Sequence, residues 1–146
     1  EALVVTLPEA PRKLDTNRLP VQVDASNIAY LKDAIWADKP ARLMQQLLME
    51  VIAAPNDRLV LNEADAGGRA TDILSGSLLE FGLDAQSNEA IVVFDAVRIR
   101  AGKPIEKKRF EAKKPVTADL PGPAGEALND AANQVAADIA AWVHAG

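Results

Sequence analysis

Residues 30–52 read YLKDAIWADKPARLMQQLLMEVI and decide the fold of this chain. The run begins as an extended segment that carries Tyr30 and Trp36, and it ends as an amphipathic helix. Asp38 is the expected N-cap, and Pro40 suits the first turn, where a missing N–H is tolerated. Apolar side chains then recur at helical spacing and predict one buried stripe, made of Leu43, Met44, Leu47, Leu48, Val51 and Ile52.

The composition indicates an ordinary globular domain. The chain has 146 residues, of which 49% are hydrophobic and 25% charged, and we expect residues 1–146 to form a single domain. Its net charge of −5 argues against nucleic acid as a partner, because phosphate neutralisation needs clustered cations. There is no cysteine, which excludes disulfides and thiolate metal sites. No apolar run approaches the length of about 18 residues that a membrane span needs.

The remaining elements follow from hydrophobic periodicity and from turn residues. Residues 28–31 read as a short extended piece, and residues 124–145 as a second amphipathic helix. Pro20 predicts that its strand is an edge strand or carries a bulge. The expected order is β-β-α-β-β-β-β-α, which favours an α+β two-layer sandwich, a mostly antiparallel sheet with both helices on one face. The strands are expected at residues 3–7, 18–23, 58–61, 70–84, 89–100 and 105–112.

Two positions in the long strands stand out. Gly76 interrupts its strand and indicates a bulge or a close backbone approach. Asp95 interrupts an otherwise apolar strand face, and a carboxylate there needs a partner. Arg109 on the next strand is placed to supply one, so we expect a cross-strand ion pair with a structural role.

Sites for catalysis or for cofactors are weakly supported by the sequence. His144 is the only histidine, and it falls in the last helical turn, where no triad or zinc site can assemble around it. Glu63 and Asp65 lie in an expected loop, but their spacing does not fit a calcium loop. The glycine pair at residues 67–68 lacks phosphate-binding spacing. We therefore expect no enzyme activity and no cofactor.

The opening stretch also resembles a known family. Residues 30–38, YLKDAIWAD, followed by an amphipathic helix, resemble the auxiliary lipoprotein components of ABC-type transport systems, the paraquat-inducible protein C-like family. Residues 10–21, APRKLDTNRLPV, and residues 109–112, RFEA, fit the same pattern. The resemblance covers most of the chain and implies the same kind of α+β fold.

The resemblance also implies a function. Such proteins work with an MCE-domain protein and its ABC permease and ATPase in lipid transport. It implies a periplasmic lipoprotein of a Gram-negative bacterium, anchored in the outer membrane through an N-terminal cysteine. The chain begins with Glu1, so we expect that a signal peptide and this cysteine precede it. Tyr30 and Trp36 are the candidate contacts to a partner protein or to lipid, and a homo-oligomer stays open.

Two other functions remain open. A two-layer sandwich can open a groove between helices and sheet, which would suit a lipid-binding shuttle. An envelope assembly or regulatory lipoprotein, for example one that docks on a cell-wall enzyme, is the other alternative. Co-purified lipid would favour the shuttle, and genes for an MCE-domain protein, permease and ATPase nearby would favour the transport adaptor.

Overall fold

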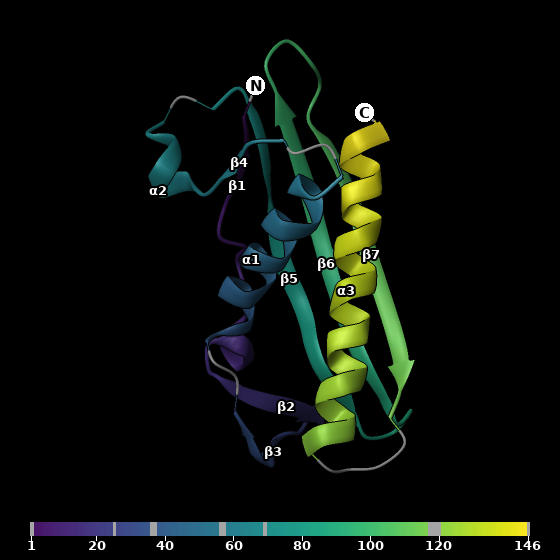
Figure 1. Ribbon diagram of the computed structural model, residues 1–146. Coiled ribbons are helices and arrows are strands. Elements are labelled where there is room, and N and C mark those ends of the chain that lie inside the picture. Colours follow the sequence, from purple (N-terminus) through teal and green to yellow (C-terminus); the bar gives the residue numbers. More distant parts are fainter. Residues whose placement is uncertain are drawn as a thin grey trace.

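Three long consecutive strands form the largest part of the sheet (Figure 1). The computed structural model describes residues 2–24, 26–35, 38–55, 58–68, 70–116 and 121–145. β5 (Asp72–Asp84), β6 (Glu89–Arg100) and β7 (Glu106–Pro115) pair antiparallel along nearly their full lengths. The turns at residues 85–88 and 101–105 join them, as the turn residues predict.

The first part of the chain runs along the other edge of β5. β1 (Leu3–Val5) lies parallel to the start of β5, and β2 (Arg18–Gln22) lies parallel to its end. Between them come the 3-10 turn η1 (Arg12–Leu14) and a bridge from Glu9 to Ser77. β4 (Val60–Leu61) extends the sheet beside β1, and β3 (Ile28–Ile35) extends it beside β2. Within the described residues these seven strands form one sheet.

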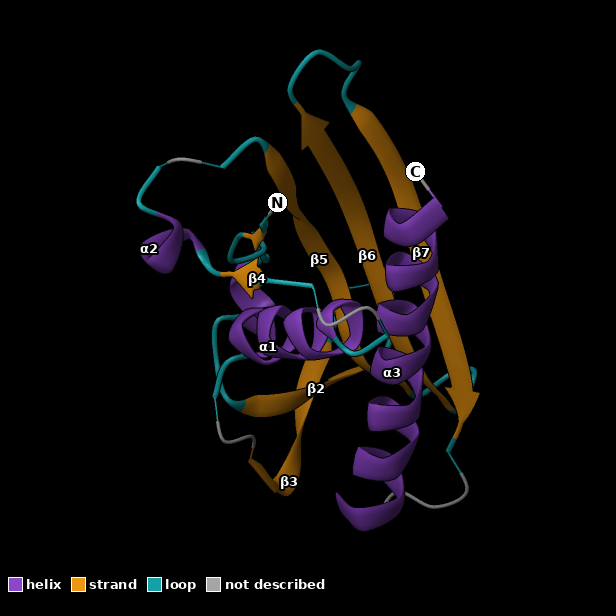
Figure 2. Cartoon of the chain, turned by 45° about the horizontal axis from the view of Figure 1, so that its top comes forward, coloured by secondary structure: helices purple, strands orange, loops and turns teal. Residues whose placement is uncertain are grey.

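Two helices cover one face of this sheet (Figure 2). α1 (Pro40–Ala53) packs beside α3 (Pro121–Ala145), and α3 lies across β6 and β7. The predicted α+β two-layer sandwich is therefore confirmed. The α3 side chains that enter the core are small or medium-sized, and alanine dominates, so the helix approaches the sheet closely. They include Leu128, Ala131, Ala132, Val135, Ala136, Ile139 and Val143.

The start of α1 differs by one residue from the prediction. Pro40 is the first helical residue, as expected, but Lys39 is the N-cap and makes no side-chain capping bond. The Oδ1 atom of Asp38 accepts instead from the N–H of Lys39, at 2.8 Å, and Oδ2 lies 3.2 Å from Nε of Arg42. Of the predicted apolar stripe, Met44, Leu48 and Ile52 are fully buried and the other three are half-buried.

Three local predictions need correction. β2 is not an edge strand, since it pairs with both β3 and β5; the alternative of a bulge is confirmed, between Arg18 and Pro20. The piece expected at residues 28–31 continues as a strand to Ile35. The expected loop at residues 62–69 contains a short helix, α2 (Glu63–Ala66), because the Asn62 side chain caps the N–H of Asp65 at 2.8 Å.

A bulge also changes the faces of β5. The register to β6 shifts between Leu78 and Glu80, so that Leu79 is the additional residue. Leu78 and Phe81 therefore both reach the core, although simple alternation puts them on opposite faces. Gly76 marks a close approach, since a Cβ there would lie 2.1 Å from the carbonyl oxygen of Asp95.

The sheet gives the molecule two distinct ends. β5 has 13 residues, and at about 3.3 Å per residue its two ends lie about 40 Å apart. Ala2, the β6–β7 turn and the last turn of α3 gather at the end where β5 begins (Figure 1). The β2–β3 hairpin lies at the opposite end.

Candidate functional site

The β2–β3 hairpin presents the one sequence-predicted contact residue that the structure describes. Tyr30 lies on β3 opposite Pro20 of β2, and its side chain is 37% exposed. Its hydroxyl donates to the carbonyl oxygen of Lys13 at 3.2 Å. The guanidinium carbon of Arg18 lies 5.6 Å from the ring centroid, a cation–π distance. Tyr30 is thus partly open to solvent and also held in place. Trp36, the other predicted contact, lies outside the described residues.

The turn of this hairpin is fixed by Asp24. Its Oδ1 atom accepts from the backbone N–H groups of Ser26, at 2.8 Å, and Asn27, at 3.0 Å. The side-chain amide of Asn27 also donates to this carboxylate and, with the backbone donors, lowers the pKa of Asp24. The turn exposes Val23 on one side and Ile28 on the other, 43% and 41% respectively. We call Val23, Ile28 and Tyr30 the hairpin surface.

A hollow of about 430 Å³ adjoins the hairpin surface. Its walls come from β2, β5, β6 and β7, and both apolar and charged side chains line it. Lys13 and Glu80 close one side, with Nζ and Oε1 2.5 Å apart. Gly82 lets β2 approach β5, since a Cβ there would lie 2.5 Å from the carbonyl oxygen of Pro20. The apolar part is formed by Pro20, Ile28, Phe81, Ile91 and Val93.

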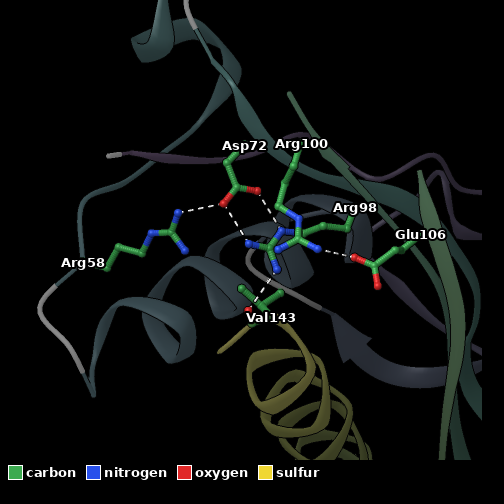
Figure 3. Close-up of polar contacts among 6 residues, drawn as sticks. All are labelled: Arg58, Asp72, Arg98, Arg100, Glu106 and Val143. Carbon is green, nitrogen blue, oxygen red and sulfur yellow. Dashed lines mark hydrogen bonds and ion pairs between the residues drawn. The ribbon is translucent and has the colours of Figure 1, made fainter. Parts of the chain in front are cut away.

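At the opposite end, a buried polar cluster anchors α3 (Figure 3). Arg98 is 4% exposed, and its Nε and Nη2 atoms donate to the two carboxylate oxygens of Asp72 at 2.7 and 2.8 Å. Its Nη1 atom donates to the carbonyl oxygen of Val143 at 2.9 Å, which satisfies one of the last carbonyls of α3. Arg58 adds a bond to Asp72 at 2.8 Å, and Arg100 binds Glu106 next to the cluster. These bonds join β5, β6, β7, α3 and the segment before β4.

Opposite charges lie side by side in this cluster, which holds three arginines and two carboxylates. Burial on its own would raise the pKa of Asp72, but the hydrogen bonds from Arg98 and Arg58 outweigh it, and the pKa lies below its ordinary value. Asp72 is therefore ionised at neutral pH. We read the cluster as a structural link between sheet and helix.

The predicted pair on the uncovered face of the sheet is present. Arg109 and Asp95 lie opposite each other, and Nε and Nη2 of Arg109 donate to the two carboxylate oxygens at 2.6 and 2.9 Å. The hydrogen bonds from Arg109 lower the pKa of Asp95, and Asp95 raises the pKa of Arg109. The sequence places Asp95 within an apolar strand face. In the structure Asp95 pairs on this face with Arg109, whose side chain is 63% exposed.

One polar network escaped the sequence analysis. Gln45 lies within the apolar face of α1, and its amide donates to the carbonyl oxygen of Val5 at 2.9 Å and to Glu63 at 3.0 Å. Glu63 also accepts from the N–H of Leu7 at 2.7 Å, which lowers its pKa. The network ties α1, β1 and α2 together. The signal for this network in the sequence is Gln45, a polar residue within the apolar stripe of α1.

In the parts of the chain that the structure describes, no three His, Cys, Asp or Glu side chains gather as a metal site. His144 lies exposed in the last turn of α3, where the sequence places it. Among the described residues, no helix has both the length and the apolar content that a bilayer crossing requires.

The fold defines a class of small α+β domains in which helices cover one face of a single sheet. Within this class, residues 1–140 match the family described as the ABC-type transport auxiliary lipoprotein component, and the chain belongs to that family. Its family therefore makes it an auxiliary transport component of the lipoprotein type. A search of curated proteins found no match.

Solved structures share the fold at low sequence identity. A Xanthomonas campestris protein of family DUF330 superposes with a TM-score of 0.84 at 17% identity, over 97% of this chain and 84% of that one. A second, uncharacterized protein gives a TM-score of 0.83 at 15% identity, over 98% and 92%. PelC from Paraburkholderia phytofirmans, solved as a dodecamer, gives 0.57 at 11% identity, over 94% and 84%.

Proposed function

We propose that this protein is a non-enzymatic adaptor of an MCE-associated ABC lipid transport system. It would be held at the outer membrane by an N-terminal lipid, and it would receive the MCE-domain protein in the periplasm. The observation that carries the proposal is the family match over residues 1–140. The family description supports the transport and lipoprotein parts, and the MCE partner and the outer membrane are our additions.

The geometry supports an adaptor because the two ends of the molecule differ. The described chain begins at the end of the sheet where β5 starts, and the hairpin surface lies about 40 Å away at the other end. A tether before residue 2 would leave the hairpin surface pointing away from the membrane. Tyr30 suits a protein contact, since an ordered aromatic side chain buries a large area at low entropic cost. Trp36, which lies outside the described residues, is proposed as a second partner contact from the sequence alone.

Co-purification with the MCE-domain protein tests this proposal. The chain with its natural N-terminus would be isolated from membranes under conditions that preserve the transporter. We expect the MCE-domain protein to co-purify, and we expect the Tyr30→Ala variant to retain much less of it. Leu59→Ser, which changes a 60% exposed side chain at the opposite end, is the matched control. Absence of the MCE-domain protein from the parent preparation would refute the adaptor function.

We also propose that several copies assemble around the transport path. PelC, which shares the fold, was solved as a dodecamer. A ring of small adaptors would surround a conduit that one copy could only touch. Light scattering after size-exclusion chromatography measures the mass directly; a mass of 15.6 kDa for the chain at every concentration would contradict assembly.

A lipid-binding shuttle is the second candidate function, and one cleft favours it. Between α1 and α3 lies a mostly apolar cleft of about 410 Å³, whose lining consists of Leu43, Met44, Leu47, Phe81 and Ala132 together with Asn129 and Asn133. Native mass spectrometry of the purified protein distinguishes the two functions. A stoichiometric lipid that Leu47→Trp displaces would favour the shuttle, whereas a lipid-free protein would favour the adaptor.

A further inference from the structure

The β6–β7 turn carries a local charge opposite to that of the chain. Residues 100–108 contain Arg100, Lys103, Lys107 and Lys108 against one carboxylate, Glu106, which gives this segment a charge of +3. The whole chain has a net charge of −5, so the rest of the molecule carries −8. Arg100 and Glu106 bind each other, which leaves the lysines as the outward charge of the tip.

The same turn exposes an apolar side chain. Ile105 is 67% exposed, more than any other large hydrophobic residue among those described, and Leu59 at the same end of the sheet follows with 60%. An exposed isoleucine next to lysines suits a bilayer interface, where the apolar group can enter between headgroups that attract the cations.

The position of the turn is set by the sheet register. Asp72, the first residue of β5, pairs with Arg100, so residues 101–105 project beyond the end of β5 (Figure 1). The N–H of Ala101 donates to the carbonyl oxygen of Thr71 at 3.0 Å, which holds the base of the turn. β1 runs parallel to β5 with Val4 opposite Ile73, and Ala2 therefore lies at the same end. A lipid attached before Ala2 would bring this turn to the membrane.

We propose that the tip formed by residues 101–105, together with Lys107 and Lys108, binds the surface of an anionic phospholipid bilayer. The inference rests on the proposed N-terminal lipid anchor and adds a second membrane contact. A second contact adds to the affinity of the anchor for the membrane, because lysines are attracted to an anionic surface. It also fixes the orientation, with the long axis of the sheet rising from the membrane and the hairpin surface held away from it.

A polarity-sensitive fluorophore tests this contact cleanly because the chain has no cysteine of its own. Ile105→Cys and Val23→Cys would each be labelled in the chain without a lipid anchor. Vesicles of phosphatidylcholine, with or without phosphatidylglycerol, would then be added. We expect a blue shift at position 105 with the anionic vesicles only, and no shift at position 23. No shift at 105, or an equal shift at both positions, would overturn the proposal.

Charge neutralisation gives an independent measurement that keeps the native Ile105. We expect Lys103→Gln and Lys107→Gln each to raise the lipid concentration for half-maximal binding in flotation about fivefold, and the double variant about 25-fold. Lys113→Gln, at the other end of β7, is the matched control and should change binding little. Equal losses for Lys113→Gln and Lys103→Gln would contradict a specific tip. No transport partner is present in either experiment, so their failure is distinguishable from failure of the adaptor function.

Discussion

Arg98 links α3 to the sheet through a buried side chain. It is a buried cation that binds both oxygens of Asp72 and one of the last carbonyl groups of α3 (Figure 3). A buried charge is tolerated only when it is paired and its hydrogen bonds are satisfied. Removal of either partner leaves an uncompensated charge in the interior, whereas replacement of both by apolar groups can be nearly neutral.

We predict that Asp72→Asn lowers the free energy of unfolding by about 3 kcal/mol or more, because Arg98 then stays buried without its counter-charge. Urea denaturation followed by circular dichroism measures the loss. The Asp72→Asn/Arg98→Met double variant should recover part of it. Asp95→Asn, which breaks an exposed pair, is the comparison and should cost less. Similar losses for the two single variants would contradict a special role for the buried cluster.

The same carboxylate predicts how stability depends on pH. The folded pKa of Asp72 lies below its ordinary value of about 3.9, so its contribution is complete above about pH 5 and is lost as the pH falls through the lowered pKa. We expect the urea midpoint of the parent protein to fall between about pH 5 and 2, and that of Asp72→Asn to fall less steeply. Parallel slopes would mean that Asp72 is not paired in solution.

At the scale of single elements, β5 depends on the backbone contact at Gly76. A Cβ at this position would lie 2.1 Å from the carbonyl oxygen of Asp95, so Gly76→Ala should destabilise the protein by about 2–4 kcal/mol. Gly125 in α3 has no atom within 4 Å of the corresponding position, and Gly125→Ala should stabilise by about 0.5–1 kcal/mol. Thermal unfolding of both variants gives the comparison. A neutral Gly76→Ala would show that β5 and β6 can move apart there.

The alanine-rich face of α3 is the second element that can be tested. Ala136 is fully buried against the sheet, and Ala136→Leu should cost about 1–3 kcal/mol because the helix would have to move outward. The next residue, Ala137, is exposed, and Ala137→Leu should stay within about 0.5 kcal/mol of the parent. Chemical denaturation of the pair measures the difference. Equal stabilities would contradict close packing of α3.

The elements with strong periodicity could be predicted from the sequence, and the exceptions have physical causes. β6 was expected at its observed bounds because its β-branched residues are flanked by turn signals. The bulge at Leu79 could not be predicted, since alternation in β5 looks unbroken until the register to β6 is known. β2 lies inside the sheet although Pro20 has no N–H to donate, because the bulge next to Pro20 accommodates the missing hydrogen bond.

The polar contacts also differ in whether the sequence predicts them. The Asp95–Arg109 pair could be predicted, because both residues lie on consecutive strands joined by a short turn. The cluster of Arg98, Asp72 and Arg58 could not, because its members are joined only by tertiary packing and lie up to 40 positions apart in the chain. The exposure of Tyr30 also depends on how the β2–β3 hairpin packs at the end of the sheet, which local sequence does not specify.

At the scale of the whole molecule, the fold separates two surfaces along one axis. The basic tip and the beginning of the described chain share one end, and the hairpin surface occupies the other. The three-stranded meander gives the axis its stiffness, since β5 and β6 are paired over almost their full lengths. An adaptor built in this way would hold its partner at a fixed height above the bilayer.

Site-specific photo-crosslinking in living cells tests this arrangement most directly. A photoreactive phenylalanine analogue would replace Tyr30 in one strain and Ile105 in another, and the cross-linked products would be identified by mass spectrometry. The account predicts a product with the MCE-domain protein from position 30 and none with that protein from position 105. A product with it from position 105 alone, or from neither position, would contradict the account.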